Sequence, residues 1–321
     1  MATAATSSLA GTCGLHGAVI PLLSLAIAQA AWIPVADAVR QYNVPASPPR
    51  SWFAIGPPVE HSGVHTVPLG LAIIATGLVV HPGPMWFAAA SVCLLLTWLA
   101  TVLCIGRFAV SLFRVKPVLR HLDGAWFLVP ATLFGAAVAT TTLSLHTTSN
   151  FQPQLMRLAV IAASAGLVNY WIVAGAAAVR ILRHGLGNDR VVLWWIAMGC
   201  AGLAAAAIAS VLQTPHAGLV GLHQVLSAAM AVTLALAVVL LVPVLIGSVN
   251  FLSRCCHFRD KAAWPPTFST AVFALGCLGT GAVLHLEVVR AVGRYAAIAT
   301  LVMWTATALW NASIVLRNSL T

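Results

Sequence analysis

The sequence predicts an all-α integral membrane protein with about nine transmembrane helices in tandem hairpins. Three observations support this fold class: composition, the spacing of charged residues, and the side on which basic residues fall. Of 321 residues, 60% are hydrophobic and 7% are charged, and the mean hydropathy is +0.96. Soluble domains carry about 25% charged residues. A chain this poor in charge cannot cover a soluble surface, so it must face lipid.

Runs without Asp, Glu, Lys or Arg locate the helices, because one span needs about 20 apolar residues. The longest runs, 61–106 and 191–253, each hold two helices, split at "HPGP" (81–84) and "TPHAG" (214–218). The other runs hold one each. We therefore predict one transmembrane domain, 1–321, with helices near 14–35, 64–81, 84–106, 124–146, 157–181, 191–213, 218–248, 266–286 and 295–316.

Basic residues give the orientation. When nine spans are threaded through a membrane, only Arg157, Arg290 and Arg294 of the 16 basic residues fall on one side. The positive-inside rule then places the C-terminus in the cytoplasm and the N-terminus outside. The net charge of +10 is interpreted as this topology signal and not as nucleic-acid binding.

The first helix of each complete hairpin is rich in Gly, Ala, Ser and Thr, and the second is bulkier. Small residues let helix backbones approach closely. Pro68 and Pro130 lie in two of these first helices, and we expect them to kink the axis. Such helices suit the inside of a ring better than its lipid face. Tight packing without any pathway is the alternative interpretation.

Four stretches together resemble a known family. They are "DGAWFLVPATLFGAAVA" (123–139), "AAAVRILRHGLGNDRVVLWWIAMGCAGLAA" (176–205), "WPPTFSTAVFALG" (264–276) and "YAAIATLVMWTATALW" (295–310). Their order and their placement in successive hairpins are similar to the tellurite-resistance/C4-dicarboxylate transporter family. That family includes plant slow anion channels and bacterial sulfite exporters.

The resemblance implies ten helices in five hairpins around a central pore, lined by the first helix of each hairpin. Only three predicted helices precede 124–146, so the first pore-lining helix is expected to be missing. Phe273 matches the family's pore-occluding aromatic residue, and Ala274 stands where the family has proline. An aromatic ring in a narrow apolar constriction blocks ions by steric exclusion and dewetting. The resemblance also implies assembly as a homotrimer.

The predicted function is passive transport or export of small anions, of the C4-dicarboxylate, tellurite or sulfite type, through a Phe-gated pore. Phe273 is the expected gate, and Pro68, Thr76, Pro130 and Thr132 are expected to line the pore. No Asp, Glu, Lys or Arg lies deep in a predicted helix, so neither a carboxylate proton relay nor an arginine clamp is available. We expect that the protein is not an enzyme and that it has no catalytic residue, metal or cofactor. The chain has more arginine than lysine and abundant alanine, which favours a bacterial protein and therefore a location in the inner membrane.

Two other function classes remain open. The chain could be a non-conducting, degenerate family member that acts as a membrane scaffold. It could also be a haem- or quinone-binding membrane subunit, for which His16, His223 and His285 lie nearest to membrane depth. Haem ligation would need two histidines facing each other at matched depth, and these three are predicted at differing depths.

Overall fold

The structure is a computed structural model that describes residues 65–81, 83–114, 122–147, 150–185, 194–214, 221–254 and 264–319. Every regular element within these residues is helical. The elements are α4 (Thr66–Val79), α5 (Pro84–Arg114), the 3-10 turn η3 (Gly124–Phe127), α6 (Leu128–Leu145), α7 (Gln152–His184), α8 (Trp195–Leu212), α9 (His223–Arg254), α10 (Trp264–Val283) and α11 (Glu287–Ser319).

Seven of these helical segments are long and apolar enough to cross a membrane, and α4 is a shorter apolar helix of 14 residues. The prediction of an all-α integral membrane protein is therefore confirmed. The expected helix at 14–35 lies outside the described residues.

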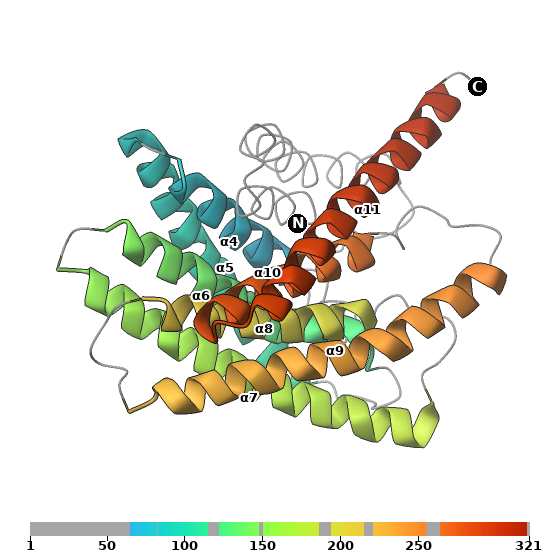
Figure 1. The fold of residues 1–321 in the computed structure, drawn as a ribbon, viewed down its shortest axis with the longest axis horizontal. Helices are drawn as coiled ribbons and strands as arrows, with labels where there is room; N and C mark the ends of the chain where they lie inside the picture. The colour runs from blue at the N-terminus through green and yellow to red at the C-terminus, as the bar shows by residue number, and fades with distance from the viewer. Residues whose placement is uncertain are drawn as a thin grey trace.

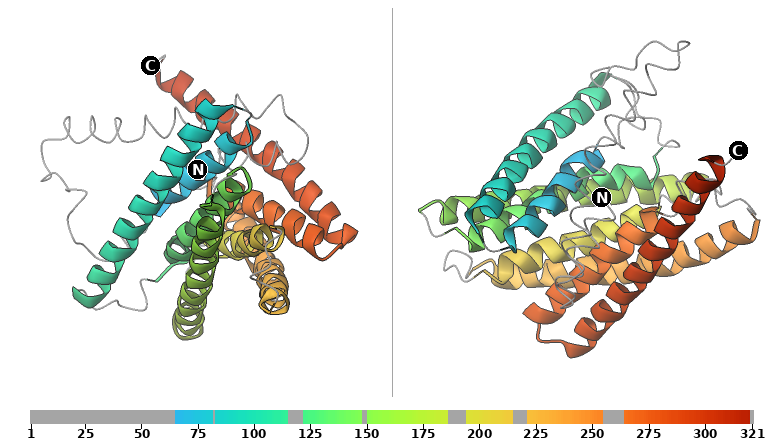
Figure 2. Two further views of the ribbon diagram at one scale, coloured as in Figure 1. Left: turned by 90° about the vertical axis from the view of Figure 1, so that its left-hand side faces the viewer. Right: turned by 90° about the horizontal axis from the view of Figure 1, so that it is seen from above.

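The helices form four consecutive hairpins, α4–α5, α6–α7, α8–α9 and α10–α11 (Figure 1). The first members of these hairpins also pack against one another in chain order, α4 on α6, α6 on α8 and α8 on α10. Figure 2 shows the result in its left view, where the hairpins spread like a fan, with α5 at one edge and α11 at the other. The row α4, α6, α8, α10 is called the inner row below.

Burial separates the inner row from its partners. In the most apolar stretch of the spans, 83% of residues are buried in α6 and in α8, and 61% in α10. The corresponding share is 33% or less in α5, α7, α9 and α11. These second helices expose large apolar side chains such as Leu95, Ile172 and Val239, which suits contact with lipid. The small-residue helices therefore lie inside, as the sequence predicts.

The two prolines of the inner row do not act as expected. Pro68 is the third residue of α4, and Pro130 is the third residue of α6. Proline has no backbone N–H, and N–H groups in the first turn of a helix have no acceptor within the helix in any case. At α6 the Trp126 carbonyl accepts from the Leu128 N–H, where the 3-10 turn becomes an α-helix. The predicted kinks are therefore wrong. Among the described helices, α9 carries a proline in its interior, Pro243.

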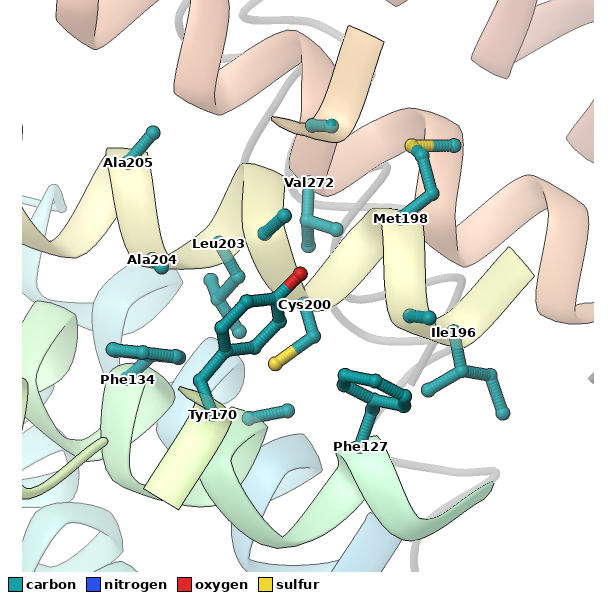
Figure 3. Close-up of a cluster of buried hydrophobic side chains, with 14 of the residues drawn as sticks. Phe127, Phe134, Tyr170, Ile196, Met198, Cys200, Leu203, Ala204, Ala205 and Val272 are labelled. Carbon is teal, nitrogen blue, oxygen red and sulfur yellow. The ribbon is translucent and has the colours of Figure 1, made fainter. Parts of the chain in front are cut away.

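A tyrosine from an outer helix fills the centre of the largest core cluster. Tyr170 of α7 is fully buried, and its ring lies among Phe127, Phe134 and Cys200 in Figure 3. The Phe134 ring reaches α7 because residue 166 is glycine, where a Cβ atom would lie 2.7 Å from that ring. Large rings therefore fill the gaps that the small residues of the inner row leave.

Two indole N–H groups join helices across the apolar interior. Trp98 Nε1 donates to Thr140 Oγ1 at 3.1 Å, which connects α5 with α6. Trp195 Nε1 donates to Ser248 Oγ at 2.8 Å, which connects α8 with α9. Most other hydroxyl groups return to a carbonyl of their own helix, as Thr76 does to Ala72.

Ser248→Ala should lower the free energy of unfolding by about 1 kcal/mol, because the Trp195 N–H loses its acceptor. Unfolding of the purified chain in one detergent measures the change. Ser210→Ala is the matched control, since the Ser210 hydroxyl bonds the Ala207 carbonyl within α8. Equal losses in the two variants would show that the α8–α9 bond contributes nothing.

Candidate anion pathway

Helix α10 places Phe273 in the inner row. One face of α10, including Ser269, Phe273 and Gly276, packs on α8. The opposite face, including Ala274 and Leu278, packs on α11. Phe273 is therefore held on the side that faces the rest of the inner row, where a pathway between inner helices would run.

The backbones of α8 and α10 meet at glycines beside Phe273. A Cβ atom on Gly202 would lie 2.7 Å from the Phe273 Cα atom and 3.0 Å from its nitrogen. A Cβ atom on Gly276 would lie 2.5 Å from the Gly202 carbonyl oxygen. One turn earlier, a Cβ atom on Gly199 would lie 2.8 Å from the Ser269 Cα atom. Because the obstructing atoms are largely backbone, only glycine fits at this crossing without movement of a helix.

The Phe273 side chain is 5% exposed and belongs to the main core cluster. This burial suits an aromatic residue that closes a pathway, and it suits ordinary core packing equally well. Helix α10 runs unbroken from Trp264 to Val283, so Ala274 lies within a continuous helix. Ala274 is fully buried against Ala297 of α11.

Two buried hydroxyl groups lie on the same helix face as Phe273. Ser269 and Thr280 are 0% and 2% exposed, and neither hydroxyl oxygen has a hydrogen-bond partner within the described part of the chain. Positions 269, 273 and 280 fall on one side of an α-helix with 3.6 residues per turn. A buried hydroxyl without a partner is costly, and it is available to a ligand that accepts a hydrogen bond. The sequence prediction missed these two residues, although their spacing from Phe273 was the available signal.

The other expected lining residues lie on α4 and α6. Pro68 and Pro130 are buried, Thr76 is partly buried, and the Thr132 hydroxyl donates to the Val129 carbonyl at 2.8 Å. Because α4 packs on α6, these four residues occupy neighbouring helices. Helix α8 lies between α6 and α10 in the row, so Phe273 is not adjacent to them. A shared lining role for all five stays a prediction.

The histidines expected near membrane depth lie at helix ends. His223 is the first residue of α9, and His285 lies in the turn between α10 and α11, and both are exposed. His16 lies outside the described residues. In the part of the chain that the structure describes, no group of three or more His, Cys, Asp or Glu side chains could hold a metal ion.

Comparison with known families decides what this helical architecture is. Residues 1–311 match the sequence model of the voltage-dependent anion channel family. The chain belongs to this family. The match confirms the relationship that the four stretches indicate, and it extends over nearly the whole chain. No curated protein matches the sequence significantly.

Membership of the voltage-dependent anion channel family makes the chain a multi-pass membrane protein of an anion channel and transporter family. The family consists of channels and transporters, so transport is the general function of the fold. The inner row is then the part of the chain in which an anion pathway is to be sought.

Proposed function

We propose that the chain passes small anions passively along the inner row, and that the Phe273 ring closes the pathway. The observation that carries this proposal is the arrangement on α10, where unpartnered hydroxyl groups of Ser269 and Thr280 flank a buried aromatic ring. An anion that loses water in a narrow passage needs hydrogen-bond donors, and these hydroxyls supply them. The ring itself excludes water and ions.

The substrate class is small inorganic anions or C4-dicarboxylates, including tellurite and sulfite. Neutral donors and an apolar ring favour weak binding and passive passage over tight, coupled transport. The membrane is a bacterial inner membrane, with the N-terminus outside, the C-terminus in the cytoplasm, and a homotrimer as the assembly. The positive-inside bias and the family support these assignments.

Substitution of the two hydroxyl residues tests the proposed pathway. Ser269→Ala and Thr280→Val should each slow chloride or nitrate flux into liposomes about fivefold, because loss of one neutral hydrogen bond costs about 1 kcal/mol. Ser210→Ala, whose hydroxyl bonds within α8, should leave the flux unchanged. Flux that is insensitive to both substitutions would remove the hydroxyls from the pathway.

A non-conducting scaffold is the second candidate, and the α8–α10 crossing favours it. Backbone contact at Gly202 and Gly276 leaves no room between these two helices at Phe273. A scaffold would show no anion flux from the wild type or from Phe273→Ala, although both proteins are folded in the membrane.

A further inference from the structure

A buried arginine near the end of α7 has no carboxylate partner among the residues that the structure describes. Arg180 is 8% exposed, and its Nη1 donates to the Gly185 carbonyl at 2.6 Å. Its Nε has no hydrogen-bond partner, and no carboxylate pairs with the guanidinium among the described residues. An arginine carries five N–H donors, and the enclosed Nε–H is one that remains unused. Arg290, in contrast, pairs with Glu287 on α11.

Trp194 adds a second unused donor at the same place. Its ring centre lies 5.8 Å from the guanidinium carbon of Arg180. Trp194 is 6% exposed, and its indole N–H is enclosed without an acceptor. The residue is also the N-cap of α8, and its side chain does not cap the helix. The N-terminus of a helix carries a partial positive charge and free N–H groups.

A buried cation and an enclosed indole N–H without an acceptor among the described residues therefore lie close together, beside the N-terminus of α8. Burying an unpaired charge is expensive. The group that would satisfy all three partners carries negative charge and several acceptor oxygens. Arginine and helix N-termini both bind such groups readily.

We propose that Arg180, the Trp194 indole N–H and the first turn of α8 bind one oxyanion, such as a phosphate or sulfate group. Helix α7 has 33 residues and is about 50 Å long, whereas the hydrocarbon core is about 30 Å thick. Arg180 lies in the last turns of α7, which ends at His184, and is therefore at headgroup level. A phospholipid phosphate and a free anion can both reach this depth. The site does not depend on the role of Phe273.

The free-anion arm uses thermal unfolding of the full-length chain in detergent, in sodium phosphate or sodium chloride at matched ionic strength. Phosphate should raise the midpoint of the wild type by about 3 °C, because it binds only the folded state. Arg180→Gln and Trp194→Phe should lose this rise. Trp194→Phe keeps an aromatic ring beside Arg180 and removes the N–H with the five-membered part of the indole, so it tests binding if Arg180→Gln does not fold. Arg183→Gln, an exposed neighbour on α7, should respond like the wild type.

The lipid arm compares the same proteins in bilayer discs of phosphatidylcholine alone and with added phosphatidylglycerol. A rise that needs phosphatidylglycerol, and that Arg180→Gln or Trp194→Phe removes, assigns the site to a lipid phosphate. A rise with inorganic phosphate and the same variant pattern assigns it to a free anion. Either result supports the proposal.

Two results would overturn the proposal. One is a wild-type midpoint that neither phosphate nor phosphatidylglycerol raises, or a rise that Trp194→Phe leaves unchanged or that Arg183→Gln also abolishes. The other is a phosphate response of the same size in Arg180→Gln and in the wild type, which would show that Arg180 does not hold the anion.

Discussion

Gly202→Ala should lower the free energy of unfolding by about 1–3 kcal/mol, the usual cost of overpacking a well-packed core. The new methyl group would lie 2.7 Å from the Phe273 Cα atom, and backbone atoms cannot turn away as a flexible side chain can. Helices α8 and α10 must therefore separate. Unfolding of the purified chain in a single detergent measures the change.

Gly70→Ala and Gly175→Ala are the matched controls for this crossing. A Cβ atom at either position would have no heavy atom of the described residues within 4 Å, apart from its own helix backbone and chain neighbours. Alanine in a helix interior is then expected to stabilise by about 0.5–1 kcal/mol relative to glycine. If Gly202→Ala is as stable as Gly175→Ala, the backbones of α8 and α10 are not in close contact at Gly202.

Phe273→Ala should raise passive anion flux at least tenfold in reconstituted liposomes. The ring is the largest side chain on the α10 face that carries Ser269 and Thr280, and its removal opens that face to water and ions. A barrier that is lower by about 1.4 kcal/mol gives a tenfold faster rate. The rate of change of an anion-sensitive dye signal inside the liposomes, normalised to the amount of inserted protein, measures the flux.

Phe268→Ala controls for loss of packing. Phe268 is 2% exposed on the same helix, but it lies on a different side of α10 from Phe273. Truncation of a buried phenylalanine costs about 3–5 kcal/mol wherever it occurs, so both variants lose stability. If Phe268→Ala raises the flux as much as Phe273→Ala, the increase is leakage from a damaged fold and the gate assignment is wrong.

The apolar helices that the structure describes could be predicted from charge spacing, because each span must bury its backbone polar groups in about 20 apolar residues. Small residues in the first helix of each hairpin likewise predicted the inner row. Helix ends were less predictable. Helix α7 begins at Gln152 and continues past Arg180 to His184, because a helix extends beyond the hydrocarbon core into the charged interface.

Contacts between helices could not be predicted, because they depend on which faces meet. The sequence shows that residues 202 and 276 are glycine, but only the fold shows that they touch beside Phe273. Pro68 and Pro130 were misread for a related reason, since their effect depends on where the helix begins. The lack of a carboxylate partner for Arg180 among the described residues is likewise seen only in the folded chain.

The reversal potential of Phe273→Ala in a planar bilayer tests the central claim most directly. With a tenfold potassium chloride gradient and no other ions, a current carried by chloride reverses near the chloride equilibrium potential, about 59 mV for a monovalent ion. The proposed anion pathway predicts reversal close to this value. Reversal near the potassium potential, which has the opposite sign, or no current from protein that is folded in the bilayer, would contradict it.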